Sequence, residues 1–341
     1  LSCVTNMVDV LLRLRISFTS VLTVVLNEAS RFENDSKRWE LLDNLGKILK
    51  SYQVNSFDIE SEILRAFNQY DVIHFVDGEH SGLLVALAKL NGLMKNGPKL
   101  VATFHQPDYV MKDLVPKPRF LEAFDTIHLM SPCQKQAFLD LGVTGNKLVV
   151  VPHGVSDEHY KPSISSNLAG PAKSEIESVQ FKLQGKKVCL TVGNWLRDYD
   201  TFLQVAREFR NREDIYFVAV SRGLQLEINS EDRNILVFNE GLEDRTLHWF
   251  YRRAELMFLP LKGGAANNAI LEAMAANVPI ITSDLPSTRY YTNGKSICCS
   301  NVNTFVAEIN RTLVTTKFES VTKAPFEWSK IAKMHVQELY E

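Results

Sequence analysis

This sequence has no long hydrophobic run. No apolar stretch reaches the length of about 18 residues that a membrane-spanning helix needs. In residues 1–15, Arg13 and Arg15 follow the apolar residues, whereas the basic residues of a secretory signal peptide precede its apolar run. We therefore expect a buried helix over residues 1–15, with peripheral contact to a membrane surface as the second interpretation.

Excess positive charge and paired cysteines are also missing. The 38 Lys and Arg residues are balanced by 40 Asp and Glu residues, so we expect no nucleic-acid partner, which would need a basic patch. The five cysteines are scattered and include no C-x-x-C pair, which argues against a disulfide framework or a zinc site and favours a reducing cytoplasm. Cys298 and Cys299 are adjacent, and we expect them to be ordinary strand residues.

The 341 residues and the 45% hydrophobic content suit about two domains with full cores. From residue 69 onward, apolar strand patterns alternate with polar loops and helical patterns, which is typical of parallel sheets covered by helices. We predict strands over residues 70–76, 99–104, 126–130, 147–151, 187–193, 215–220, 235–238, 256–261, 280–284 and 297–299. We predict helices over residues 83–93, around 120–124, from Ser131 and Pro132 to Gly142, and over 200–210 and 245–254.

The predicted fold is α/β, with two Rossmann-like, doubly wound domains that face each other across a cleft. We expect a first domain over residues 1–160, a linker over 161–185 and a second domain over 186–325. The linker is rich in serine, proline, glycine and charge. Ligands of such sheets bind beyond the carboxyl ends of the strands, so the cleft is the expected active site.

Residues 262–281 are the most informative segment. Small residues, Lys-Gly-Gly-Ala-Ala-Asn-Asn, lead directly into the helical pattern Ala-Ile-Leu-Glu-Ala-Met-Ala, and a proline-led apolar run follows. A small loop lets a ligand approach the backbone, and the N-terminus of a helix attracts phosphate. Glu272, about a turn inside the helix, suits the hydroxyl groups of a sugar. The segment predicts a seat for a nucleoside diphosphate with Glu272 on its ribose.

Five stretches together resemble the retaining GT-B glycosyltransferases, in particular the large family four. They are 190–193 ("VGR…KG"), 150–155 with 160–162 ("IPNGVD…F-P"), 241–260 ("G…L…Y-x-x-A-D…P"), 262–281 (the "E-x7-E" region with "LEAMA-x-G-x-P-V") and 326–340 (the closing "F-x-W" helix, over 326–341, that packs back on the first domain). The resemblance covers most of the chain from about Asp71, and the order and spacing of the stretches make it specific.

The sequence departs from the family pattern in three places. Gly264 stands where the first glutamate of E-x7-E is usual. The loop after Gly193 is short, so that Arg197 falls near the family's lysine position and Asn194 near its arginine. The family's first strand and glycine-rich loop are not recognisable. Either the chain lacks them, or residues 1–26 form a divergent version.

The resemblance implies a metal-independent transfer of a sugar, with retention, from a nucleotide sugar to a sugar, lipid-linked or protein acceptor, with no cofactor. We expect donor binding by Arg197, Asn194, Gly263, Gly264, Ala265, Asn267, Asn268 and Glu272. His105, Asp77 and Glu79 follow predicted strands of the first domain and are the candidate catalytic groups, since an acceptor hydroxyl needs a base within hydrogen-bond reach.

Simpler interpretations stay open for several of these residues. Arg197 would then pair with Asp198 or Asp200, and Asn267 or Asn268 would only cap the helix. For the whole chain, the alternatives are a non-catalytic protein that binds nucleotide sugars and a nucleotide-sugar epimerase.

Overall fold

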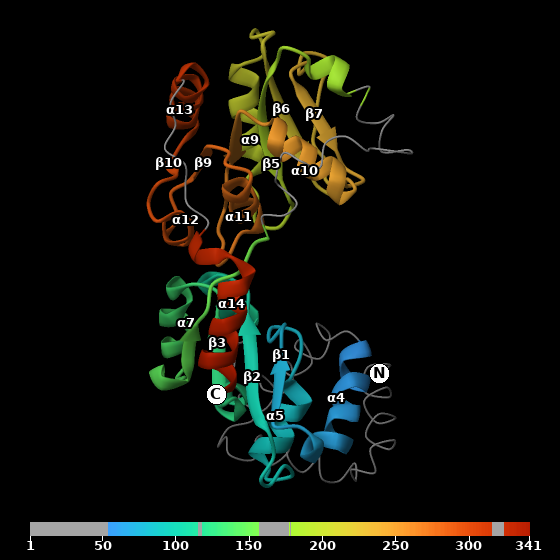
Figure 1. Ribbon diagram of the computed structural model, residues 1–341, viewed down its shortest axis with the longest axis vertical. Coiled ribbons are helices and arrows are strands. Elements are labelled where there is room, and N and C mark those ends of the chain that lie inside the picture. The colour runs from blue at the N-terminus through green and yellow to red at the C-terminus, as the bar shows by residue number, and fades with distance from the viewer. Residues whose placement is uncertain (1–53, 115–117, 157–176, 178, 316–323) are drawn as a thin grey trace, which may run out of the picture. The chain divides into compact units, whose positions relative to one another are not determined.

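A computed structural model describes residues 54–114, 118–156, 177, 179–315 and 324–341 (Figure 1). The chain divides into two compact units. The first unit is Leu1–Val151 with Met334–Glu341, and the second is Pro152–Lys333. The helix expected over residues 1–15, the divergent strand expected within 1–26, the domain boundary at 160 and most of the expected linker lie outside the described residues.

The first unit contains a sheet of four parallel strands in the order β1-β2-β3-β4. They are β1 (Val72–Phe75), β2 (Lys99–Phe104), β3 (Thr126–Leu129) and β4 (Leu148–Val150). The helices are α4 (Val54–Ala66), α5 (Leu83–Leu90), α6 (Asp108–Leu114) and α7 (Lys135–Asp140), with 3-10 turns at Phe67–Gln69, Pro118–Ala123, Pro132–Gln134 and Gly145–Lys147.

One face of this sheet is apolar and the other carries polar groups. Alternate residues such as Phe75, Ala102 and Leu129 pack against α5 and α7 in one core, because successive side chains of a strand point to opposite faces. His74 and His128 lie on the other face, where the C-terminal segment His335–Tyr340 contacts them.

The second unit contains six parallel strands in the order β10-β9-β8-β5-β6-β7. They are β5 (Lys187–Val192), β6 (Ile215–Val220), β7 (Ile235–Phe238), β8 (Leu256–Leu259), β9 (Ile280–Ser283) and β10 (Ile297–Cys299). The chain first builds outward from β5 to β7 and then returns to the other side of β5. This reversal puts a topological switch point between β5 and β8, where doubly wound sheets bind ligands.

Helices cover both faces of the second sheet (Figure 1). Phe202 of α9 (Tyr199–Glu208) and Phe305 of α13 (Val302–Val314) pack on one face. On the other face lie α10 (Asp244–Arg253), α11 (Asn268–Ala275) and α12 (Pro286–Thr292). Central strands buried on both faces read as continuous apolar runs, which is why the predicted strands 187–193 and 256–261 are confirmed as β5 and β8 with shorter ends.

Two of the family-like stretches meet in the second unit. The backbone N–H of Val155 donates to the carbonyl of Phe326 at 2.8 Å, and that of Trp328 donates to the carbonyl of Val155 at 3.3 Å. A Cβ atom on Gly154 would lie 2.5 Å from the ring of Trp328, so this close approach requires glycine. The helix α14 (Trp328–Met334) follows, and Met334–Glu341 belong to the first unit.

Three smaller predictions met different outcomes. The helix expected around residues 120–124 is a 3-10 turn, and the helix expected over 83–93 ends at Leu90, before Gly92 with a φ of 72°. Pro132 opens its turn as expected, with the side chain of Gln134 accepting from the N–H of Ser131 at 3.1 Å. Within the described residues no helix has both the length and the apolar character to cross a membrane.

Candidate active site

The loops that follow β5 and β8 are joined at the switch point of the second sheet. Arg197 forms an antiparallel bridge with Leu261. The N–H of Asp198 donates to the carbonyl of Pro260, and the N–H of Lys262 donates to the carbonyl of Leu196, both at 2.9 Å. The sheet topology and these bonds bring Arg197 next to the small-residue loop, although Arg197 and Lys262 are 65 positions apart in the sequence.

The guanidinium of Arg197 is held by oxygen atoms that carry no full charge. Nε donates to the carbonyl of Val192 at 2.8 Å, Nη1 to that of Trp195 at 3.0 Å, and Nη2 to Oδ1 of Asn267 at 3.2 Å. Three of the five N–H groups are bound in this way among the described residues, which leaves two to face an anion. The guanidinium is therefore oriented but not neutralised.

The alternative partners of Arg197 are engaged elsewhere. Asp198 caps α9 and accepts from the backbone and hydroxyl of Thr201 at 3.2 and 2.8 Å. Asp200 forms an ion pair with Lys262 at 3.3 Å. The surface ion pair expected under the simpler interpretation is absent from this part of the structure. Burial lowers the pKa of Arg197, and the nearby Tyr199, Tyr251 and Glu272 act in the opposite direction.

Gly193 makes room for this guanidinium. Its φ is 93°, and a Cβ atom there would lie 2.7 Å from Nη2 of Arg197. Glycine alone adopts this backbone conformation readily and lacks the clashing atom. The strand-end glycine therefore has a direct physical role in placing the cation.

The small-residue loop leads into α11 as predicted. Asn267 is the N-cap, and its Oδ1 accepts from the N–H of Ala269 at 3.1 Å as well as from Arg197. Asn268 is the first helical residue and is exposed, while Gly263 and Ala265 are buried and Gly264 is half-buried. Capping is therefore one confirmed role of Asn267, and the same amide couples the helix end to the guanidinium.

Glu272 lies one turn inside α11 and is held by a residue that the sequence analysis did not single out. The hydroxyl of Tyr251, in α10, donates to its Oε2 at 2.6 Å. Burial raises the pKa of Glu272, whereas the hydrogen bond from Tyr251 and the charge of Arg197 act in the opposite direction. Tyr251 stands in the "Y-x-x-A-D"-like stretch, which was the available signal.

Two further groups complete this edge. The side chain of Lys262 supplies a second cation, although it is exposed and paired with Asp200. Asn194, the expected arginine counterpart, is exposed, and its carbonyl accepts from the N–H of Arg197 at 3.1 Å in a turn. Its side chain has no demonstrated role, so donor contact by Asn194 stays a prediction.

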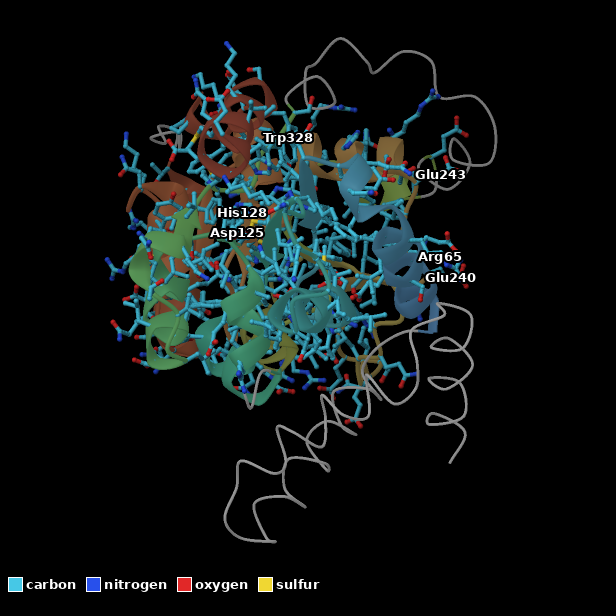
Figure 2. All side chains as sticks on the ribbon, turned by 90° about the horizontal axis from the view of Figure 1, so that it is seen from below. Arg65, Asp125, His128, Glu240, Glu243 and Trp328 are labelled. Carbon is cyan, nitrogen blue, oxygen red and sulfur yellow. The ribbon has the colours of Figure 1, made fainter. Side chains whose placement is uncertain are left out.

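A hollow of about 540 Å³ lies at the carboxyl ends of β6 and β7, next to β5 in the sheet. Arg222 and the backbone around Gly241 line it. Glu240 and Glu243 also line it, and both are exposed (Figure 2). The sequence analysis missed this hollow, because its lining is mostly ordinary loop residues that adopt the shape only when two strand ends are adjacent.

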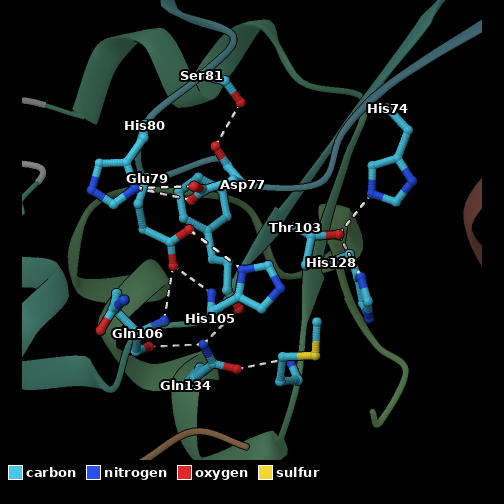
Figure 3. Close-up of polar contacts among 12 residues, drawn as sticks. His74, Asp77, Glu79, His80, Ser81, Thr103, His105, Gln106, His128 and Gln134 are labelled. Atoms are coloured by element: carbon cyan, nitrogen blue, oxygen red, sulfur yellow. Dashed lines mark hydrogen bonds and ion pairs between the residues drawn. The ribbon is translucent and has the colours of Figure 1, made fainter. Parts of the chain in front are cut away.

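Asp77, Glu79 and His105 come together in the first unit (Figure 3). Asp77 and Glu79 follow β1, and His105 follows the neighbouring strand β2. The ligand atoms of the three side chains all lie within 4.8 Å of one another. The structure thus brings the three candidate residues together at adjacent strand ends, and their catalytic role stays a prediction.

The three residues have different environments. The side chain of Asp77 is exposed and accepts from Nδ1 of His80 at 3.0 Å. The imidazole of His105 is 42% exposed, whereas the carboxylate of Glu79 is fully buried. Oε1 of Glu79 accepts from the backbone N–H groups of His105 and Gln106. Glu79 thus positions the loop that carries His105, and the two exposed groups are the ones available to an acceptor.

The sequence of the chain matches two family models. "Glycosyltransferase Family 4" matches residues 48–159, and "Glycosyl transferases group 1" matches residues 186–314. Together the two models match more than two thirds of the chain. The chain belongs to the group 1 glycosyltransferases. In this glycosyltransferase the first match covers the Asp77–Glu79–His105 cluster, and the second covers the whole switch-point site.

Solved structures support the GT-B fold of this glycosyltransferase. The trehalose-phosphate synthase (UDP-forming) of Burkholderia xenovorans, solved with glucose-6-phosphate, is 14% identical with a TM-score of 0.62 over 96% of this chain and 82% of that one. HepE of Anabaena, solved with UDP, is 11% identical with a TM-score of 0.62 over 82% and 81%. The sucrose-phosphate synthase of Thermosynechococcus elongatus is 15% identical with a TM-score of 0.58 over 82% and 76%. A search of curated proteins by sequence found no match.

Proposed function

We propose that this glycosyltransferase moves a sugar from a nucleotide-sugar donor to an acceptor hydroxyl, with retention at the anomeric carbon and without a metal ion or other cofactor. The second unit would hold the donor, and the first would contribute the groups that handle the acceptor. The observation that carries the proposal is the convergence of Arg197, the N-terminus of α11 and Glu272 at the switch point of the second sheet.

The diphosphate of the donor suits the positive end of this site. Arg197 has two N–H groups left for phosphate oxygens, and its planar fork matches them. The first backbone N–H groups of α11 add hydrogen bonds and the helix dipole. Stabilisation of the leaving group by these charges replaces the metal ion that other transferases use.

The ribose and the base of the nucleoside would bind to different residues near Arg197. Glu272, pinned by Tyr251 at 2.6 Å, is placed to accept hydrogen bonds from the ribose hydroxyls. The hollow beside Arg222 is the candidate place for the base. Gly263, Gly264 and Ala265 would let the sugar and the diphosphate approach the backbone closely.

In the reaction, the bond between the anomeric carbon and the phosphate oxygen breaks, and the nucleoside diphosphate leaves with the electron pair. The acceptor oxygen forms its bond to the anomeric carbon on the same face of the sugar. Asp77 would take the acceptor proton, and His105 would hydrogen-bond to the reacting sugar. Glu79 would keep the His105 backbone in place.

The donor and the acceptor are identified only by class. UDP sugars come first among the donors to test, because HepE was solved with UDP and the trehalose-phosphate synthase is UDP-forming. Sugar phosphates come first among the acceptors, and lipid-linked and protein acceptors follow. We propose that the protein acts in the cytoplasm, since the cysteines of the described residues are free thiols. Peripheral contact with a membrane is a further proposal.

The test is to incubate the protein with UDP, GDP, ADP and dTDP sugars and candidate acceptors, with and without a chelator. We expect acceptor-dependent release of the nucleoside diphosphate, unchanged by the chelator, and a product that NMR shows to retain the anomeric configuration. Inversion, or loss of release with the chelator, would overturn that part of the proposal.

The substitution Glu272→Ala separates this proposal from its rivals. We expect donor affinity to fall by at least tenfold, which corresponds to about 1.4 kcal/mol. Unchanged affinity would show that the ribose binds elsewhere. Donor binding without release under any condition would favour the non-catalytic binding protein, and an isomerised donor without release would favour the epimerase.

A further inference from the structure

The Asp77–Glu79–His105 cluster has the composition of a metal site. Two carboxylates and one imidazole offer three ligand atoms within 4.8 Å of one another. In a cluster of this kind the carboxylates commonly face solvent and bind nothing. Here the most buried of the three side chains carries the argument.

Glu79 presents an unsatisfied oxygen to the cluster. Its side chain is completely buried, and its Oε1 is engaged by the backbone of His105 and Gln106. Its Oε2 is buried and has no hydrogen-bond partner among the described residues. A buried carboxylate oxygen without a partner is unfavourable, because the group has lost its water. A cation bound at this oxygen would remove the penalty.

The imidazole of His105 lies at a distance from this oxygen that suits two ligands of one ion. Nδ1 of His105 is 3.7 Å from Oε2 of Glu79, which is too long for a hydrogen bond. Two ligands at about 2.1 Å from a tetrahedral ion lie about 3.4 Å apart. The half-exposed imidazole of His105 can close that difference by a small rotation, while Glu79 stays fixed.

The donor set selects the type of ion. Carboxylates alone would favour Mg²⁺ or Ca²⁺, but an imidazole ligand favours Zn²⁺ and its neighbours in the first transition series. The third ligand is already supported from outside, because Nδ1 of His80 lies 3.0 Å from Oδ1 of Asp77. Such outer hydrogen bonds orient ligating carboxylates in metal sites.

We propose that Asp77, Glu79 and His105 bind a divalent transition-metal ion, with Zn²⁺ as the probe, and that the bound ion inhibits sugar transfer. The inhibitory part rests on the proposed function, because the ion would occupy the lone pairs of Asp77 and His105 that the acceptor reaction uses. The donor diphosphate is met by Arg197 and α11, so transfer itself proceeds without the ion.

Calorimetric titration of the full chain with Zn²⁺ tests the binding without any substrate. We expect one ion per chain at this site, and a visible absorption band when Co²⁺ replaces Zn²⁺. Asp77→Asn, Glu79→Gln and His105→Gln should each lower the affinity by about 10–100-fold. Asp140→Asn removes an exposed carboxylate of the same unit and should bind Zn²⁺ as the unsubstituted protein does.

Either of two outcomes would show that the site does not exist. The protein would bind no Zn²⁺, or the unsubstituted protein and the three ligand variants would bind Zn²⁺ with equal affinity. Asp77 is exposed, so Asp77→Asn keeps the test decisive even if the buried Glu79→Gln variant fails to fold. Thermal unfolding of each variant without metal verifies its folding.

Activity assays then separate the two parts of the proposal. Zn²⁺ should abolish nucleoside diphosphate release in proportion to occupancy, and a chelator should restore it. Binding without inhibition would leave the metal site standing and overturn the inhibitory role. If no donor is ever turned over, the proposed function fails while the titration still decides whether the site exists.

Discussion

The hydroxyl of Tyr251 lies 2.6 Å from Oε2 of Glu272, so a fully buried phenol in α10 fixes a half-buried carboxylate in α11. Both helices cover the same face of the second sheet. The bond fixes one carboxylate oxygen, and Oε1 takes no part in it. Tyr251 is therefore a positioning residue for the group that we expect to recognise the ribose.

Removing this hydroxyl should weaken donor binding without disturbing the core. We expect Tyr251→Phe to reduce donor affinity by about tenfold, because a hydrogen bond to a charged group contributes about 1.5–3 kcal/mol. The loss should be smaller than that of Glu272→Ala. Calorimetry with the donor found by the release assay measures both variants, and Tyr216→Phe, on β6, is the matched control. An unchanged affinity in Tyr251→Phe would contradict the positioning role.

The same variant should change the pH dependence of donor binding. The hydrogen bond from Tyr251 lowers the pKa of Glu272 against the effect of burial, so Tyr251→Phe should raise that pKa further. Since the ribose would be bound by the ionised carboxylate, donor affinity should be lost at a higher pH in the variant as the pH falls. An identical pH profile in the two proteins would argue against this linkage.

Gly193→Ala should displace Arg197. The added Cβ would lie 2.7 Å from Nη2 of Arg197, at a φ of 93° that alanine adopts with strain. We expect a stability loss of about 1–2 kcal/mol and a loss of nucleoside diphosphate binding that approaches that of Arg197→Ala. Urea unfolding and calorimetry measure the two effects. Gly223→Ala also has a positive φ, of 73°, but nothing within 4 Å, so it should lose stability while it keeps diphosphate affinity.

Gly264→Glu should be tolerated and should change how the donor sugar is bound. A Cβ at Gly264 would meet only Ser287 Oγ at 3.8 Å and the carbonyl of Ala266 at 3.9 Å, and its φ is not in the left-handed region. We expect the free energy of unfolding to change by less than about 0.5 kcal/mol. If the missing family glutamate limits this protein, Gly264→Glu should raise the turnover of at least one nucleotide sugar, whereas Gly264→Ala should not. A marked loss of stability would show that the loop has no room for the side chain.

Acid should destabilise the first unit through its polar sheet face. Nε2 of His128 donates to the carbonyl of Val151 at 2.7 Å, so its Nδ1 must accept from Thr103 Oγ1 at 2.7 Å. Thr103 Oγ1 then accepts from Nε2 of His74 at 2.6 Å, and Nδ1 of His74 accepts from the hydroxyl of Tyr340 at 2.8 Å. The two bonds in which a ring Nδ1 accepts, from Thr103 to His128 and from Tyr340 to His74, require both imidazoles to be neutral.

The pKa values set the pH range of this effect. Burial, with the charges of neighbouring histidines, lowers the pKa of His74 from 6.5 to about 4 and that of His128 from 6.5 to about 3. A base with a lower pKa in the folded chain takes up its proton on unfolding, so stability is full above pH 6.5 and falls as the pH drops toward 4. At about pH 5 unfolding should take up about two protons from these residues.

NMR titration of the histidine rings checks this prediction, with His74→Asn and His128→Asn to assign the signals. Both rings should stay neutral to well below pH 6.5 in the folded protein. Each variant should reduce the proton uptake on unfolding by about one. Ordinary titration of either ring would show that the hydrogen-bond chain does not form.

Most strands of the described fold could be predicted because they are buried on both faces. Val188 and Leu190 pack on one face of the second sheet and Cys189 packs on the other, so the run must be apolar throughout. The shorter helices were harder to predict from the sequence. Residues 118–123 form a 3-10 turn because their conformation depends on packing against α5 and Phe124 more than on their own periodicity.

The sequence by itself determined the strand order along the chain, the small-residue loop before Glu272 and the loops that carry Arg197, Asp77 and His105. Local pattern suffices there, since burial and turn formation depend on neighbouring residues. Only the tertiary structure decided that Tyr251 bonds to Glu272 and that Gly193 makes room for Arg197. It also decided that Glu79 turns an unsatisfied oxygen toward His105. These relationships depend on distances between separate elements that must be right to within a few tenths of an ångström. Packing sets these distances, and no spacing in a sequence encodes them.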